Sequence, residues 1–277
     1  MARILDTSPD FDAYARTVAL DAPWMKEQKW AEDYGRIHAD VFEAFFAAGG
    51  APEGKAAMVR ELSRIRSRVE TAAPVVREAI EALDPALADA LGVAPEHPPL
   101  HVLLVGTFSV NAAVGRLDGD VAVFHCLEWF QDPEGARILI AHEGTHAWHQ
   151  IARGDAGPQD DLAWVTFYEG LAVRASRTLV PGRPESDYFW YGHEGFDEWL
   201  PWCKEHRGPL RERFAGMLDD PLAAETFFGA GTVDGHWRTG FFVADELVSR
   251  IDAPLPELAQ MSVDEGRAAV RSALDRD

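Results

Sequence analysis

Two histidines four residues apart, with a glutamate directly after the first, constrain this chain more than any other feature. They are His142, Glu143 and His146. On an α-helix, positions four apart lie only about 40° apart around the axis, so both imidazoles point the same way and can chelate one Zn²⁺. Glu143 projects from an adjacent stripe, where it can act as a general base rather than as a ligand. The spacing therefore predicts a helix that carries a metal centre on one face.

The residues around the motif predict that this helix extends well beyond it on both sides. Asp132, Pro133 and Glu134 are typical of an N-cap, a first-turn proline and a first-turn acid. Gly154 is a natural C-cap. The motif is thus expected in the middle of the helix, where the four-residue spacing works.

A catalytic zinc usually takes three ligands from the protein and one water, so a third ligand must come from elsewhere. His149 follows His146 by three positions. Three ligands from consecutive turns of one straight helix fit a tetrahedron poorly, so we interpret His149 as a packing residue or as one that supports a ligand from behind. The pair His193 and Glu194 lies in an aromatic-rich segment, which we interpret as part of a substrate pocket rather than as a ligand set.

Glu169 is the preferred third ligand. A second helix is predicted from residue 160 or 161 to residue 179, and the residues around Glu169 in it are mostly apolar. A carboxylate in such a stretch needs a partner, because burying an unpaired charge is expensive. A metal ion is one such partner, and an ion pair with Arg174 is the alternative. Gly170 would let a neighbouring backbone approach closely.

The rest of the chain divides into a helical first third, a short β region and a helical remainder. Residues 10–92 are predicted to be helical because apolar residues recur at helical spacing. The three expected core stripes are Ile37, Val41, Phe45; Met58, Leu62, Ile65, Val69; and Val76, Ile80, Leu83, Leu87. Residues 95–99 form a break, and helices are expected from Asp132 to the C-terminus.

Residues 100–126 are expected to form two to four strands. The run from residue 100 to residue 105 is of β type, and Asp118-Gly119 is a strong hairpin signal before Val121–Phe124. The fold class predicted is α+β, mostly helical, with a small antiparallel or mixed sheet before the metal-binding helix. Residues 1–95 would form a helical N-terminal region and residues 96–277 the catalytic region.

Taken together, the two candidate metal motifs resemble the gluzincins, zinc metallopeptidases in which a glutamate on the helix after HExxH is the third ligand. Here Glu169-Gly170-Leu171-Ala172 follows His146 after 22 residues. More narrowly, the chain is similar to predicted zinc-dependent proteases of bacteria that carry HExxH followed by EGLA. The resemblance covers roughly residues 100–250, and it includes Asn111-Ala112 and the segment 238–242.

The resemblance implies a zincin-like fold with one Zn²⁺ per chain, held by His142, His146 and Glu169, and with Glu143 as the base. An edge strand beside the metal would bind the substrate backbone, for which residues 111–116 are the candidate. An ordinary structural hairpin is the alternative for that segment. Thermolysin-like members carry an Asp four residues after the ligand Glu, but this chain has Val173 there. The residue that orients the zinc histidines is therefore unassigned.

Stabilising the oxyanion of a hydrolysed amide requires a further donor. In sites of this type the donor is often a Tyr, His or Arg from the late helical part. His236 and Arg238 are the candidates, and packing at the surface is the alternative for both.

The composition of the chain argues against two classes of binding partner. The 277 residues carry a formal net charge of −20, which argues against nucleic acid and against anionic membrane surfaces. Two cysteines exclude a disulfide framework, and the first residues lack a continuous apolar run typical of an export signal. We therefore expect a cytoplasmic protein, and the resemblance implies a peptide or a small amide as its substrate. The sequence does not indicate its oligomeric state.

Two other functions remain open at this stage. The chain could be a zincin-fold binding or regulatory protein that recognises its partner through the aromatic segment 188–202. A closed zinc site with four protein ligands would support that reading, whereas the intact Glu143 argues against it. The chain could also be a zinc hydrolase of a non-peptide amide. A site of two histidines and a glutamate can also bind other divalent ions.

Overall fold

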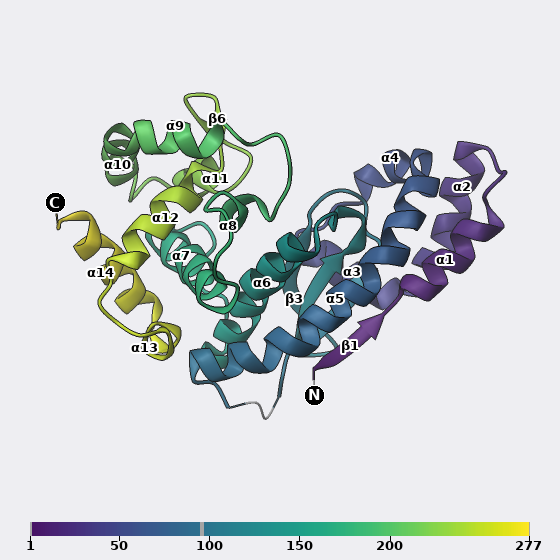
Figure 1. Ribbon diagram of the computed structural model, residues 1–277, viewed down its shortest axis with the longest axis horizontal. Helices are drawn as coiled ribbons and strands as arrows, with labels where there is room; N and C mark the ends of the chain where they lie inside the picture. The colour runs from purple at the N-terminus through teal and green to yellow at the C-terminus, as the bar shows by residue number, and fades with distance from the viewer. Residues whose placement is uncertain (1, 95–96, 277) are drawn as a thin grey trace. The chain divides into compact units, whose positions relative to one another are not determined.

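The computed structural model describes residues 2–94 and 97–276, and the chain divides into two compact units (Figure 1). The first unit comprises Met1–Pro85 and Pro95–Ala147, and the second comprises Ala86–Ala94 and Trp148–Asp277. The N-terminal helices and the strands that follow them therefore belong to the same compact unit. The sequence analysis instead divides the chain at residue 95, into a helical N-terminal region and a catalytic region. That division by function stays a prediction.

A four-stranded mixed sheet forms the centre of the first unit, in the order β1-β2-β4-β3. The strands are β1 (Arg3–Asp6), β2 (Leu100–Leu104), β3 (Ala112–Leu117) and β4 (Asp120–Cys126). β1, β2 and β4 run parallel, and β3 pairs antiparallel with β4 at the edge. The sheet is thus mixed, and it includes an N-terminal strand that the sequence analysis does not predict.

The β3–β4 hairpin forms where the sequence predicts it. Asp118 and Gly119 both have positive φ, 53° and 87°, as a type I′ turn requires. The register pairs Leu117 with Asp120 and Ala112 with His125. Because β3 has a strand neighbour on one side only, the candidate segment 111–116 coincides with an edge strand.

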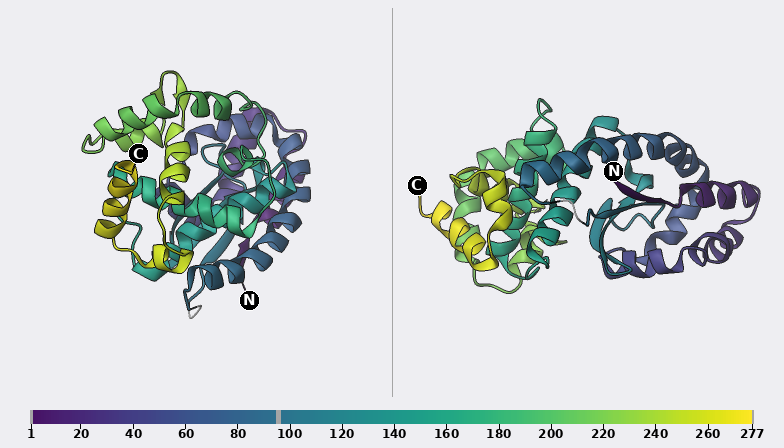
Figure 2. Two further views of the ribbon diagram at one scale, coloured as in Figure 1. Left: turned by 60° about the vertical axis from the view of Figure 1, so that its left-hand side comes forward. Right: turned by 90° about the horizontal axis from the view of Figure 1, so that it is seen from below.

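Helices cover both faces of this sheet, as the views in Figures 1 and 2 agree. On one face, Phe45 of α3 (Ala39–Ala47) packs against Phe124 of β4, with ring centroids 5.9 Å apart. On the other, Asp84 of α5 (Leu62–Leu91) lies 3.3 Å from His101 Nε2. Nδ1 of His101 in turn contacts Nε2 of His125 at 3.0 Å. Successive side chains of a strand alternate between faces, so Phe124 and His125 necessarily point to opposite helices.

The helical first third is confirmed, with one correction. Its elements are α1 (Ser8–Thr17), α2 (Pro23–Lys29), the π-helix η1 (Trp30–Gly35), α3, the 3₁₀ turn η2 (Pro52–Gly54), α4 (Lys55–Arg60) and α5. All members of the second and third predicted stripes are buried, as are Val41 and Phe45. Ile37 is 60% exposed, so its placement in the core was wrong. It precedes the first residue of α3, and helical periodicity does not extend to it.

The first unit ends with the 3₁₀ turn η3 (Leu127–Trp129) and the greater part of α6 (Pro133–Arg153). The second unit is helical around α7 (Leu162–Leu179), which packs against α12 (Thr239–Ser249) and α14 (Val263–Leu274). Its other elements are α8 (Asp187–Trp190), α9 (Trp199–Glu205), α10 (Arg207–Gly216), α11 (Ala223–Phe227), β5 (Thr232–Val233), β6 (His236–Trp237) and α13 (Leu255–Gln260). The small β5–β6 hairpin interrupts a stretch that the sequence predicts as helical throughout.

The fold is therefore α+β and mostly helical, as predicted. Within residues 2–94 and 97–276, no helix has both the length and the hydropathy needed to cross a lipid bilayer.

Candidate metal centre

The helix α6 carries the HExxH residues in its middle, between the predicted caps. The Asp132 carboxylate accepts a hydrogen bond from the Gly135 backbone N–H at 2.7 Å. Gly154 adopts φ +91°, the left-handed conformation in which glycine commonly ends a helix. The side chains of His142 and His146 are both buried, at 2% and 4% exposure. The local sequence thus fixes a regular helix through the motif and turns both imidazoles inward.

Glu169 lies in the middle of α7, which begins where the sequence predicts. The Asp161 side chain caps the helix by accepting from the Trp164 N–H at 2.7 Å. Glu169 itself is half-buried. The alternative partner, Arg174, donates to the backbone carbonyls of residues 248, 251 and 253 at the end of α12. Arg174 is therefore engaged with the helix end.

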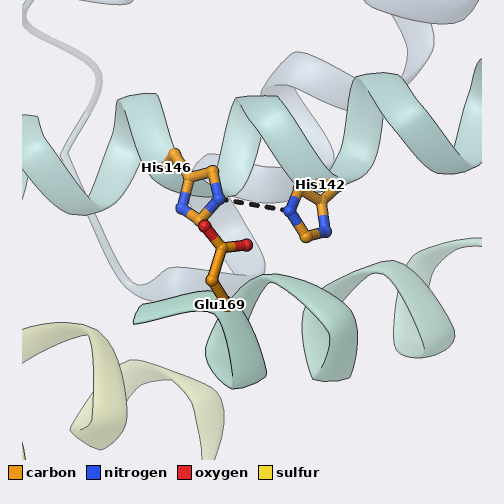
Figure 3. Close-up of side chains that lie close together, drawn as sticks. All are labelled: His142, His146 and Glu169. Carbon is orange, nitrogen blue, oxygen red and sulfur yellow. Dashed lines mark hydrogen bonds between the residues drawn. The ribbon is translucent and has the colours of Figure 1, made fainter. Parts of the chain in front are cut away.

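The three predicted ligands converge. His142, His146 and Glu169 each offer one ligand atom, and these atoms all lie within 4.8 Å of one another. Nε2 of His142 and Nε2 of His146 are 3.2 Å apart. Figure 3 shows the Glu169 carboxylate reaching from its own helix toward the two imidazoles. This group could hold a metal ion.

The donor set can be tested against the geometry of zinc. Zn–N and Zn–O bonds of about 2.0–2.2 Å in a tetrahedron place neighbouring ligand atoms roughly 3.3–3.5 Å apart. The separation of 3.2 Å between the two Nε2 atoms is close to that edge length. The limit of 4.8 Å for the whole group means that closing onto an ion requires side-chain shifts of only an ångström or so. Two imidazoles and a carboxylate are also a donor set that zinc accepts.

Comparison with known proteins adds nothing to this picture. No family model, curated protein or solved structure matches the chain. The candidate metal centre therefore rests on its own residues and their geometry.

The Glu143 side chain is more exposed than the two histidines of the motif. It is half-buried, whereas His142 and His146 are buried. Burial, and after it the charges of Glu128 and Glu143, hold the pKa of the Cys126 thiol well above its ordinary value. The Glu143 carboxylate thus contributes to the negative charge around that thiol. This placement suits a group that meets water and substrate rather than one enclosed in the core.

His149 is a packing residue in its described contacts. It is 1% exposed, and its ring lies 5.7 Å from that of Trp164 and 5.6 Å from that of Tyr168. Among the residues that the structure describes, the group that could hold a metal ion consists of His142, His146 and Glu169 and does not include His149. We call these three residues the metal-binding group. Both observations agree with its interpretation from the sequence.

The two predicted oxyanion donors lie in and after β6. The His236 ring stacks on Trp202 with centroids 3.6 Å apart. The Arg238 guanidinium lies over the Phe241 ring at 4.1 Å. These contacts fit the packing alternative, and a role for either residue at the metal stays a prediction. Glu194 is exposed and His193 half-buried, and neither belongs to the metal-binding group.

Gly170 explains how α7 is held in place. A Cβ at this position would come within 2.6 Å of the Ala244 carbonyl oxygen and 2.4 Å of Val248 Cγ2. Both belong to α12, so the absence of a side chain lets the two helices approach closely, as expected from the sequence. The residue next to the candidate ligand Glu169 therefore sets the position of the helix that carries both.

We expect Gly170→Ala to destabilise the protein by about 1–3 kcal/mol, because the Ala244 backbone must move to admit the methyl group. Urea unfolding measures the change. Gly216→Ala in α10 is the matched control, since a Cβ there meets nothing within 4 Å. It should stabilise by roughly 0.4–1 kcal/mol, by restricting the unfolded chain. Equal effects of the two substitutions would contradict the role assigned to Gly170.

Proposed function

We propose that this protein is a zinc-dependent hydrolase, and specifically a peptidase. The observation that carries the proposal is the convergence of His142, His146 and Glu169 within 4.8 Å, with Glu143 directly after the first ligand. Histidines alone would serve a structural site equally well. Three protein ligands leave a fourth position for water, and an adjacent carboxylate is what hydrolysis requires in addition.

The chemistry divides between the ion and the chain. When bound, zinc supplies a Lewis acid that lowers the pKa of a water molecule toward neutrality. The Glu143 carboxylate accepts the proton of that water and passes it to the leaving nitrogen. The ligand residues hold the site in place, because His142 and His146 sit on one regular helix and Glu169 on a second helix locked by Gly170. His236 and Arg238 remain the proposed donors to the oxyanion.

The edge strand β3 supports a peptide as the substrate. Within the described residues its outer backbone N–H and C=O groups have no strand partner, so an extended peptide can add to the sheet there by main-chain hydrogen bonds. A small amide could not use such an edge. β3 therefore favours the peptidase over a hydrolase of non-peptide amides.

Cleavage that depends on the metal tests the proposal. We expect the purified chain, supplied with Zn²⁺, to cleave members of a peptide library, as followed by mass spectrometry. Removing the metal with a chelator should abolish cleavage, and restoring Zn²⁺ should recover it, because His142, His146 and Glu169 bind a metal ion rather than act on substrate themselves. Cleavage that survives removal of the metal would refute the assignment. A zinc-loaded chain that cleaves no peptide would support the binding-protein alternative.

A further inference from the structure

An aromatic pocket lies in the second unit, outside the metal-binding residues. It has a volume of about 380 Å³ and is lined by residues of the segment 190–199 and of the β5–β6 turn and β6. Its rings and carboxylates are those of Trp190, Phe196, Trp199, His236, Trp237, Asp197 and Glu198. Of these, the proposed hydrolysis uses only His236.

The rings of this pocket are arranged around Trp190. Phe196 stacks on it face to face at 3.6 Å, while Trp199 meets it edge-on at 5.3 Å with an interplanar angle of 89°. Trp237 lies 5.7 Å away at an intermediate angle and is 42% exposed. Aromatic faces carry partial negative charge, so a cation that lies over one of these rings is attracted to it.

Two carboxylates add full negative charge to the same pocket. Asp197 and Glu198 are exposed. Among the described residues, neither forms an ion pair, and the Glu198 side chain does not cap α9 although it stands at the N-cap position. Their charge is therefore available to a ligand. Carboxylates beside aromatic faces form a set that attracts cations and repels anions.

The rings already bind one cation of the chain itself. The Arg238 guanidinium lies 5.3 Å from the Trp190 centroid and 5.4 Å from the Trp237 centroid. This arrangement shows that these rings can present a face to a guanidinium. The two carboxylates outnumber that single charge, so the pocket keeps a net attraction for a second cation.

Trp190 also carries an unsatisfied donor. Its side chain is 5% exposed, and its indole N–H meets no acceptor in the described part of the chain. Buried donors without a partner are rare in native proteins. Because Trp190 lines the pocket, we assign a carbonyl group of the ligand as its acceptor, which favours an amino-acid residue of a peptide over a simple ammonium ion.

We propose that this pocket binds the cationic side chain of a peptide, an arginine or a lysine. The two carboxylates favour a cation over a neutral ligand such as a sugar, and cation–π attraction acts over a ring face within about 6 Å of its centroid. The proposal does not depend on the metal or on hydrolysis.

Isothermal titration calorimetry on the full chain tests it, with N-acetyl-arginine amide as the probe. Glu143→Gln protein is used to prevent turnover. For a ligand of this size we expect a Kd of about 1 mM. N-acetyl-citrulline amide has the same shape without the charge, and it should bind at least about 10-fold more weakly. Absence of binding by the arginine probe, or equal binding of the two probes, would overturn the proposal.

Variants locate the binding. The double substitution Asp197→Asn with Glu198→Gln should lower the affinity for the arginine probe about 5–10-fold. Trp237→Ala should lower it about 3–5-fold, whereas Trp237→Phe should keep most of it. Glu205→Gln with Glu212→Gln is the matched control. Both residues are exposed, lie in α9 and α10 outside the pocket, and give the same charge change. An equal loss in the control pair would mean that overall charge, not the pocket, attracts the probe.

The titration is repeated with and without Zn²⁺. Binding that is unchanged by the metal is the expected result, because no pocket residue is a metal ligand. Binding that appears only with zinc would place the probe at the metal centre and overturn the pocket. A protein that cleaves no peptide but still binds the arginine probe would leave the pocket intact while refuting the peptidase.

Discussion

Glu143→Gln should retain zinc and lose hydrolysis. The substitution keeps the shape of the side chain but removes its ability to accept a proton, and general base catalysis typically contributes about 10²–10⁴-fold. We expect kcat to fall by that factor. The metal content should stay at that of the unsubstituted protein, because Glu143 does not belong to the metal-binding group. Elemental analysis and the rate of peptide cleavage measure the two quantities on the same preparation.

Glu134→Gln is the control for this experiment. It lies on the same helix, is exposed in the first turn and removes the same charge. Its kcat should stay close to that of the unsubstituted protein. A Glu143→Gln protein that is fully active would remove Glu143 from the mechanism, even if the zinc site were correct.

The features that could be predicted from the sequence are those specified locally. The caps of α6 and α7 are set by Asp132, Gly154 and Asp161, which act within a few residues of the helix ends. The hairpin at Asp118-Gly119 is specified by two residues that tolerate positive φ. The position of Glu169 beside His142 and His146 could be predicted, because a carboxylate in an apolar helix needs a partner.

Features that depend on distant partners could not be predicted in the same way. β1 is four residues long, and its pairing with β2 joins residues almost a hundred positions apart. The buried contacts of Asp84 with His101, and of His101 with His125, join a helix to two strands in the same manner. Each of these residues alone resembles an ordinary polar residue in its local segment. Only the tertiary fold brings them together.

The site shows the same limit. His236 and Arg238 are candidates because a donor to the oxyanion is chemically necessary, not because a local pattern indicates them. Their described contacts are with the aromatic rings of Trp202, Phe241, Trp190 and Trp237. The aromatic segment itself could be predicted to line a pocket, but the angles between its rings could not, because they depend on β6 packing against Trp190 and Trp199.

Glu169→Gln should lose most of its metal, whereas His149→Ala should keep it. The Gln side chain has the same size, but its neutral amide is a weak ligand for a divalent cation. Replacing residues that merely orient zinc ligands costs about 10–100-fold in affinity, so removing a ligand should cost roughly 100-fold or more. Competition with a chelator of known affinity measures this loss. Elemental analysis should show about one zinc in the unsubstituted chain and little in Glu169→Gln.

His149→Ala tests the competing ligand on the same helix. His149 is buried against Trp164 and Tyr168, so truncation leaves a cavity and should destabilise the fold by roughly 2–4 kcal/mol. His149→Phe keeps an aromatic ring in that space, so it should stay folded and separates loss of a ligand from loss of the fold. It cannot bind a metal, and it should still hold one zinc. Loss of zinc from a folded His149→Phe protein, with zinc retained by Glu169→Gln, would reverse the assignment of the third ligand. Loss from both would mean that the two residues share the site, and tetrahedral coordination with an open position for water would then no longer hold.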